Sequence, residues 1–185
     1  TTIGGQNRSY LAAVDKSTGM ATTFNPKVNS AAFSLAVSNN NLYAGGSFSS
    51  VGGQSRLGLV AIENNSGLVL PLNFNANNSV SALLLSGSTL YAAGSFTSIG
   101  GQPRNNLAAL DINTGLATAF NPNPNSYVNS LALSGSTLYA GGSFTSIGGQ
   151  ARNRIAAVDI TTALATAFNP NANSSVLSLL IDGST

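Results

Sequence analysis

Apolar residues in this chain occur in short stretches, and glycine, asparagine or proline bounds almost every one of them. One representative part of the sequence has four such stretches, at residues 128–133, 138–144, 155–159 and 164–168. None shows the spacing of three to four residues between apolar positions that an amphipathic helix requires. Short apolar segments between turn-forming residues are typical of β-strands, so the pattern predicts an all-β protein.

The segments between these stretches have the chemistry of tight turns. SGST at residues 134–137 separates the first two stretches, and DINTG at residues 111–115 is the equivalent of the segment between the last two. Gly148 and Gly149 belong to the phrase GGSFTSIGGQ, which recurs along the chain. A phosphate-binding loop would require Lys and Ser or Thr after the glycines at the start of a helix. We therefore expect these two glycines to turn a corner between strands, where the backbone needs positive φ.

The same residues return at a fixed interval of 48 positions. A glutamine marks this period at Gln6, Gln54, Gln102 and Gln150, and a tyrosine keeps the same step at Tyr43, Tyr91 and Tyr139. A fixed period of this length indicates a stacked array of equivalent units. Helical repeats of about 34–47 residues would show helical periodicity, and solenoid rungs of about 20–30 residues are shorter.

Four short strands in a unit of 48 residues describe one blade of a β-propeller. We therefore expect an all-β fold, a β-propeller of four-stranded blades with a 48-residue repeat, with about four blades or as a segment of a larger propeller. The chain is one repeat array over residues 1–185, with units at approximately 31–78, 79–126 and 127–174 and partial units at 1–30 and 175–185. Because the tyrosine takes the same strand position in each unit, we expect it in the core between blades.

The phrase LYAGGSFTSIGGQ at residues 138–150, followed by an arginine and then by an apolar strand ending in Asp159, resembles the delta-sixty repeat propellers. This family occurs mainly in large bacterial surface and secreted proteins, and the resemblance covers essentially the whole chain. It implies a propeller fold and a location outside the cell or on its surface, but no general biochemical activity. Kelch repeats are a weaker resemblance, because kelch blades carry a characteristic tryptophan and this chain has none.

The period also aligns the two ends of the sequence with the interior units. Thr1 corresponds to Thr97, and residues 183–185 correspond to residues 135–137, so a stretch of the type LYAGGSF is missing from four full units. Two alternatives remain open: a window of a longer array, or a four-unit ring whose ends share one blade that lacks a strand. Unpaired strand edges are templates for association, so we expect the chain to join a larger ring or further copies of itself.

The scarcity of charge changes the picture of possible partners. Charged residues make up 6% of the chain, against roughly 25% in a typical soluble domain. The apolar content of 43% argues against disorder. The net charge of +2 comes from scattered residues and makes no basic stripe, so we expect no nucleic-acid partner. No apolar run is long enough for membrane insertion.

Most of the charged residues follow the period. One arginine and one acid occur in each unit, and we expect each arginine to contact its acid, or the loop and strand around it, because a planar guanidinium bonds a carboxylate and carbonyls together. The alternative is a ring of anion-binding arginines. The four expected pairs are Arg8 with Asp15, Arg56 with Glu63, Arg104 with Asp111, and Arg152 with Asp159.

The chain lacks the usual materials of catalysis. It has no His and no Cys, and its acids do not come in the pairs that glycoside hydrolysis needs. DINTG at 111–115 faintly resembles a calcium loop, but the other copies replace its ligands, so a hairpin turn is the better interpretation. We therefore expect no enzyme activity, no catalytic or metal site and no cofactor.

The expected function is that of a non-catalytic extracellular structural or interaction module, with other copies or flanking repeats of the same protein as partners. The alternative is a carbohydrate-binding, lectin-like propeller. In that case the asparagine-rich loops, such as NPNPNS at residues 121–126, would hydrogen-bond glycans on one rim. Such loops also have a purely geometric explanation, because proline fixes φ and asparagine tolerates the left-handed region.

Overall fold

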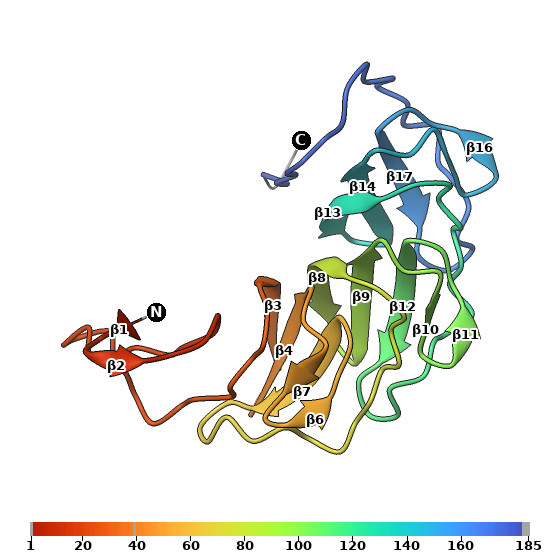
Figure 1. The fold of residues 1–185 in the computed structure, drawn as a ribbon. Helices are drawn as coiled ribbons and strands as arrows, with labels where there is room; N and C mark the ends of the chain where they lie inside the picture. Colours follow the sequence, from red (N-terminus) through yellow and green to blue (C-terminus); the bar gives the residue numbers. More distant parts are fainter. Residues whose placement is uncertain (1, 39, 183–185) are drawn as a thin grey trace.

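A computed structural model describes residues 2–38 and 40–182, and these residues contain seventeen β-strands and no helix. The strands form small antiparallel sheets in a row (Figure 1). Because no helix is present, the described residues include no helix of the length and hydropathy that a membrane span needs. The prediction of an all-β protein is therefore confirmed.

Three sheets have three strands each, and in every one the second strand in sequence lies at the centre. The first sheet contains β3 (Ala32–Ser38), β4 (Asn41–Gly46) and β7 (Leu59–Glu63). The second contains β8 (Val80–Ser86), β9 (Thr89–Gly94) and β12 (Leu107–Asp111). The third contains β13 (Val128–Ser134), β14 (Thr137–Gly142) and β17 (Ile155–Asp159). These nine strands lie at three of the four predicted strand positions of each unit.

Four two-stranded hairpins follow the same period. They are β1 (Thr2–Ile3) with β2 (Gln6–Asn7), β5 (Ser50–Val51) with β6 (Gln54–Ser55), β10 (Ser98–Ile99) with β11 (Gln102–Pro103), and β15 (Ser146–Ile147) with β16 (Gln150–Ala151). The two glycines of each phrase form the turn, with φ of 59° at Gly148 and 77° at Gly149. A Cβ on Gly148 would lie 2.3 Å from the Ala165 backbone nitrogen, so the corner also requires a residue without a side chain.

The fourth predicted strand is shorter than the sequence pattern indicates. Residues 164–168 make a single bridge, Val158 to Ala165, instead of a strand. The Thr166 hydroxyl accepts a hydrogen bond of 3.2 Å from the Phe168 amide, and such local bonds compete with a strand ladder. The prediction of a fully formed fourth strand is therefore wrong, and each sheet has three strands plus one bridging residue.

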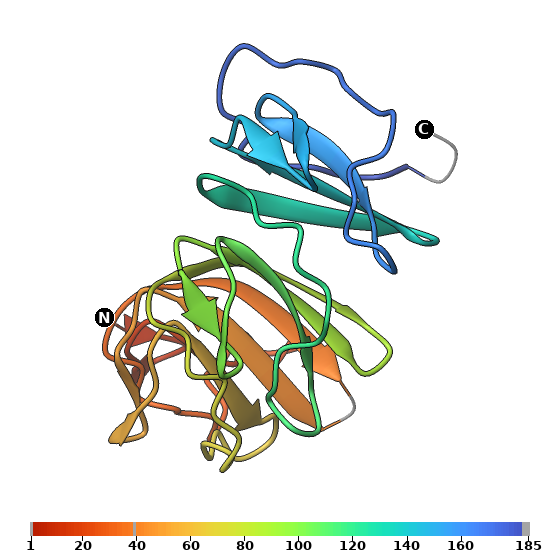
Figure 2. The same ribbon diagram turned by 90° about the vertical axis from the view of Figure 1, so that its right-hand side faces the viewer.

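The three sheets stand side by side as an open arc, with β8 in contact with both β3 and β13 (Figures 1 and 2). The amino-terminal segment continues the arc beyond β3, and the carboxyl-terminal tail continues it beyond β13 (Figure 1). The described residues thus form an open row and not the closed ring of about four blades that was one of the sequence-based alternatives.

Apolar side chains fill the spaces between neighbouring sheets. One buried cluster joins Tyr43 of the first sheet to Leu90 and Leu110 of the second, and another joins Tyr91 to Leu138 and Val158 of the third. Each tyrosine meets a phenylalanine edge to face, with ring centroids 5.4–6.1 Å apart in the pairs Tyr43–Phe74, Tyr91–Phe120 and Tyr139–Phe168. Tyr43 and Tyr91 therefore lie in the packed interior, as their strand position predicts, whereas Tyr139 is only half-buried.

Candidate functional site

The recurring arginines hold together two segments of their own unit. In the second sheet, the guanidinium of Arg104 donates to the carbonyl of Pro103 at 2.8 Å and to the carbonyl of Thr118 at 2.7 Å. Arg8, Arg56 and Arg152 make the equivalent bonds in their units. The Nε atoms of all four are buried and make no hydrogen bond within the described residues, so a dissolved anion does not reach them in this conformation.

The recurring acids have a different set of partners. The carboxylate of Asp111 accepts hydrogen bonds from the amides of Thr114 and Asn113, at 2.8 and 2.9 Å. Asp15 and Asp159 close the same type of turn, and the longer Glu63 reaches the hydroxyl of Ser66. The Thr114 amide, which makes the strongest contribution, and the Asn113 amide hold the pKa of Asp111 below its usual value.

The direct pairing of each arginine with its acid is absent from the hydrogen bonds of the described residues, whereas the contact of each arginine with the chain around the acid is present. Arg8, Arg56, Arg104 and Arg152 bond backbone carbonyls, whereas Asp15, Glu63, Asp111 and Asp159 bond the turn that follows them. The reason is the reach of the acid: a carboxylate at the end of a strand meets amides two and three residues ahead before it meets a guanidinium. Both groups remain structural.

A hollow on one rim occurs at the same place in two units. In the third unit it has a volume of about 440 Å³ and is lined by the loop at Pro122, the hairpin at Gly148 and the turn at Leu164. Its counterpart in the first unit has about 380 Å³ and is lined by the equivalent Pro26, Gly52 and Leu68. No group of three or more His, Cys, Asp or Glu side chains placed to hold a metal ion occurs among the described residues.

The asparagine-rich loops use their side chains to hold the hairpins. The Asn125 side chain accepts from the amides of Thr145 and Ser146 at 2.9 and 3.1 Å and donates to the Thr145 hydroxyl at 2.8 Å. Asn29 and Asn77 do the same in their units. A neighbouring hollow of about 550 Å³ contains the exposed Tyr127 beside Asn105 and Asn106.

One hydrogen bond between neighbouring sheets occurs twice at equivalent positions. The Leu83 amide of β8 donates to the Ser34 hydroxyl of β3 at 2.9 Å. In the same way, the Leu179 amide donates to the Ser130 hydroxyl of β13, also at 2.9 Å. The tail at residues 175–181 therefore lies against β13 as β8 lies against β3. Sequence reasoning did not identify these serines, although the spacing of Ser34, Ser130 and Ser178 in multiples of 48 was a signal for them.

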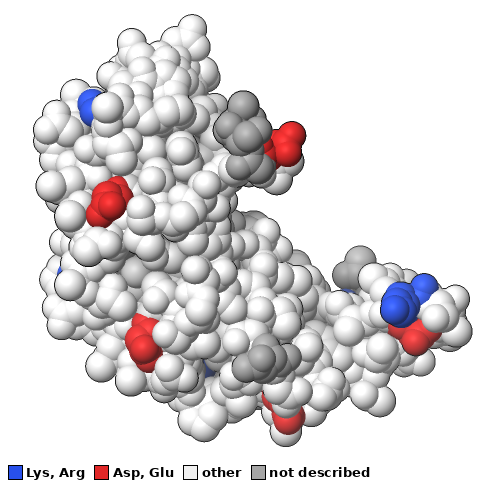
Figure 3. Space-filling view, turned by 180° about the vertical axis from the view of Figure 1, so that it is seen from behind, with Lys and Arg blue, Asp and Glu red and all other residues white. Residues whose placement is uncertain are grey.

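Both ends of the arc expose apolar residues whose equivalents face a neighbouring sheet. At the β3 end, Phe33, Leu35 and Val37 are exposed, with half of the Leu35 surface accessible. In the second sheet, Leu83 and Leu85, the equivalents of Leu35 and Val37, pack against the preceding sheet. At the tail end, Leu180 is 92% exposed, whereas its equivalent Leu84 packs against the next sheet. Figure 3 shows the space between the two ends as a hollow in the outline, with acidic atoms at its upper rim and both basic and acidic atoms on the arm below it.

Comparisons with known proteins agree with this architecture. The family described as "Domain of unknown function (DUF5122) beta-propeller" matches residues 89–111, from β9 to β12. The computationally designed Ika4 protein is similar in structure, with a TM-score of 0.56 and 18% identity over 83% of this chain and 81% of the designed one. The designed Ika8 protein is similar with a TM-score of 0.59 and 17% identity, over 89% of this chain but only 44% of its own. No curated protein matches. The chain therefore has repeat-like β structure of the β-propeller kind.

Proposed function

We propose that this chain is a non-catalytic structural or interaction module, a run of propeller blades that joins further copies or repeats of itself outside a bacterial cell. Its resemblance to the delta-sixty repeat propellers in the phrase LYAGGSFTSIGGQ supports the extracellular location and membership of that family. The absence of His and Cys from the sequence, together with carboxylates that are engaged in turns, supports a role without catalysis.

The observation that carries this proposal is the repeated contact between sheets. An amide at one position bonds a serine hydroxyl of the preceding sheet at Leu83 and again at Leu179. The same period assigns the Leu35 amide as the next donor and the Ser178 hydroxyl as the next acceptor. These two groups lie at opposite ends of the chain's arc, so each end carries one half of an interface that the molecule already forms internally (Figure 1).

Charge repulsion does not oppose contact between the two ends of the arc. Residues 31–38 and 175–181 contain no Lys, Arg, Asp or Glu, so contact between the two ends buries no charged side chain of these segments. A head-to-tail contact uses two different surfaces, and it yields a closed ring when the rotation between copies closes and a filament when it does not. The curved arc of sheets in Figure 1 favours a ring.

Sedimentation velocity of the chain at micromolar concentrations tests the proposal. We expect species larger than one chain, and we expect Leu35→Lys to return the chain to a monomer, because a charge in a buried contact is costly. Leu116→Lys is the matched control, since Leu116 is also exposed but lies on a turn away from both ends. A wild-type chain that stays monomeric, or a Leu35→Lys chain that associates as well as the control, contradicts the proposal.

A second candidate function is glycan binding, and the exposed Tyr127 beside Asn105 and Asn106 is the observation that favours it. An aromatic face next to amides is a common way to hold a sugar ring. The amides here are already used within the protein, since Asn105 donates to Asn123 and Asn106 donates to the carbonyl of Pro124. Glycan-array binding that Tyr127→Ala abolishes, and that Tyr10→Ala leaves intact, would establish this second function.

A further inference from the structure

We propose that the hollow on the rim of the third unit binds a neutral saccharide. The loop at Pro122, the hairpin at Gly148 and the turn at Leu164 form it, and all the residues that line it lie between positions 121 and 164. The site is therefore complete within the interior of the described chain, and it includes neither end of the arc nor Tyr127. This inference goes beyond the proposed joining of copies, because it assigns a separate surface to a ligand of a different chemical class.

Hydrogen bonds between main-chain groups hold the three segments in place. The Gly148 amide donates to the carbonyl of Pro122 at 2.7 Å, and the Gly148 carbonyl accepts from the Ala165 amide at 3.1 Å. The hairpin is thus tied to the loop on one side and to the segment after the turn on the other. In the first unit, the Gly52 amide donates to the carbonyl of Pro26 in the same way, at 2.8 Å. A hollow that is already formed orders few further groups when a ligand binds, which favours the binding of a small molecule.

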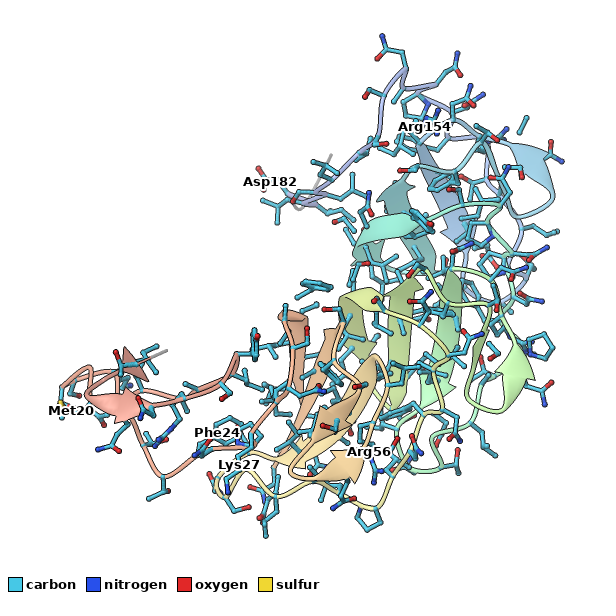
Figure 4. The ribbon with its side chains drawn as sticks, viewed as in Figure 1. Met20, Phe24, Lys27, Arg56, Arg154 and Asp182 are labelled. Atoms are coloured by element: carbon cyan, nitrogen blue, oxygen red, sulfur yellow. The ribbon has the colours of Figure 1, made fainter. Side chains whose placement is uncertain are left out.

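The lining of this hollow indicates a ligand without charge. None of the described residues that line it is Lys, Arg, Asp or Glu, and its polar side chains are amides and hydroxyls, among them Asn121 and Gln150. In the hollow of the first unit, Lys27 takes the place of Asn123. Figure 4 shows Lys27 on the amino-terminal side of the first complete sheet, at the opposite end of the arc from Arg154 of the third unit. An ionised ligand in the third-unit hollow would lose water without gaining an opposite charge, so a neutral ligand is favoured there.

Two amide side chains at this hollow are available to a ligand. Asn121 and Gln150 are exposed, and their side chains make no hydrogen bond within the part of the chain that the structure describes. The glutamine of the first unit has an internal role, because Gln54 accepts a hydrogen bond of 2.9 Å from Arg56, but Gln150 has no such bond. Each amide offers a donor and an acceptor, and a sugar hydroxyl can both accept from the one and donate to the other.

An exposed leucine gives the hollow an apolar wall. Leu164 is 59% exposed, and the equivalent Leu68 at the first-unit hollow is 67% exposed. A pyranose ring has C–H groups on its faces and hydroxyls around its edge, so Leu164 can pack on one face while the amides bond the edge. Apolar walls with a few polar groups that fix orientation are typical of small-molecule sites, and the volume of about 440 Å³ lies within their range of about 300–1,000 Å³.

An extended peptide fits this place less well than a saccharide. Peptides that add to a sheet bind chiefly through main-chain bonds along a free edge. The strand at the hollow, β16, is only two residues long, and the carbonyl of Ala151 already accepts a hydrogen bond of 2.8 Å from Arg152. Few main-chain groups therefore remain for a peptide, whereas the side-chain amides remain for hydroxyls.

Nuclear magnetic resonance of the intact chain tests this site, because it follows each side-chain amide separately. The probes are neutral trisaccharides of glucose, galactose, mannose and N-acetylglucosamine, each titrated to about 20 mM, with the peptide N-acetyl-trialanine amide as comparison. We expect at least one trisaccharide to shift the side-chain amide signals of Asn121 and Gln150 and the methyl signals of Leu164 in a saturable way. The absence of saturable shifts at these residues with every trisaccharide overturns the inference, and so does tighter binding of the peptide.

Protein variants locate the saccharide in this hollow. Gln150→Ala removes one of the two amides, and we expect it to raise the Kd, measured from the Leu164 methyl signals, about fivefold or more. Gln102→Ala is the matched control, because it makes the same change at the equivalent position of the second unit, and it should leave the Kd unchanged. Gln150 is exposed and its side chain makes no bond within the described residues, so the substitution leaves the fold intact. Equal Kd values of wild type and Gln150→Ala overturn the inference.

Two further variants separate this inference from the proposed functions. We expect Leu35→Lys, which is designed to stop the joining of ends, and Tyr127→Ala to leave the saccharide-induced shifts at Gln150 unchanged. Loss of these shifts in either variant overturns the rim site. Saccharide binding by a chain that stays monomeric supports the rim site and contradicts the joining of ends, whereas self-association without saccharide binding overturns the rim site and leaves the joining of ends.

Discussion

The separate partners of the recurring arginine and acid are best tested where the arginine is most buried, at Arg56 and Glu63. The Arg56 guanidinium donates to the carbonyls of Ser55 and Leu70 and to the side chain of Gln54, at 2.8, 3.2 and 2.9 Å. Arg56→Met keeps an apolar stem of similar length but leaves the two carbonyls without these donors. Ser55 is exposed and Leu70 is half-buried, so water replaces part of what is lost; at about 0.5–1.5 kcal/mol for each hydrogen bond, we expect a loss of about 1–3 kcal/mol in unfolding free energy.

Glu63 bonds the hydroxyl of Ser66, and the side-chain oxygen of Gln can accept the same bond. We therefore expect Glu63→Gln to change the unfolding free energy by less than about 0.5 kcal/mol, as is usual for substitutions that keep their contacts. Because the two residues share no partner, the double variant should equal the sum of the single variants to within about 0.5 kcal/mol.

Urea unfolding followed by circular dichroism, on wild type and the three variants, measures these differences in free energy. Equal slopes against urea in all four proteins show that the compared states are the same. A coupling free energy well above about 1 kcal/mol between Arg56 and Glu63 would refute the separate roles and restore the ion pair.

Three further predictions concern single positions. Gly142→Ala, whose Cβ would lie 2.1 Å from the Tyr127 carbonyl oxygen, should cost about 3 kcal/mol in urea unfolding, against about 1 kcal/mol for Gly135→Ala, which has φ of 54° and open space. Asn125→Ala should cost about 1 kcal/mol, because it frees the Thr145 and Ser146 amides, whereas Asn121→Ala on the same loop should cost nothing measurable. The amides of Thr114 and Asn113 lower the pKa of Asp111 in the folded chain. The contribution of this carboxylate to folding stability is therefore fully present above the unfolded pKa of about 3.9, and it is lost as the pH falls through the lower folded pKa. The pKa of Asp111 measured from its carboxyl chemical shift should therefore be lower in the folded chain than in an unfolded peptide. An equal pKa in both would contradict the hydrogen bonds between this carboxylate and the turn.

The repeat period was sufficient to place most of the strands. Residues 155–159 form a strand with the bounds that the pattern predicts, and the first two strands of that unit differ from the prediction by one or two residues at their ends. This agreement follows from the chemistry of the turns, since Gly135 and the Gly148–Gly149 pair all adopt the positive φ that only glycine takes readily. The fourth strand was overestimated because residues 164–168 join the ladder only around Ala165, while Leu164 and Phe168 remain exposed.

The partners of the charged residues were not accessible from the period alone. An alignment of equivalent positions shows that Arg104 and Asp111 occur together, but not that each bonds the backbone nearest to it. The repeat period also does not predict whether equivalent side chains are exposed to the same degree. Val14 and Leu110 are equivalent in the sequence, and only the structure shows that one faces solvent and the other faces a paired strand.

The two ends of the arc were foreseen only in outline. The missing stretch of the LYAGGSF type indicated unpaired edges, but the pattern did not identify Ser34 and Ser130 as acceptors between sheets. A hydroxyl in a strand of small and apolar residues is consistent with many roles, and its bond becomes evident once the neighbouring strand is placed against it.

Disulfide trapping tests most directly the claim that the two ends of the arc are halves of one interface. The chain has no cysteine, so Leu35→Cys and Ser178→Cys introduce single thiols at the proposed contact. A chain carrying both Ser34→Cys and Leu83→Cys is the internal control, because these residues already meet between the first two sheets. When the two single variants are mixed and oxidised, we predict the 35–178 disulfide in clear excess over the 35–35 and 178–178 species. Statistical proportions of the three disulfides, while the control chain crosslinks, would contradict the head-to-tail interface.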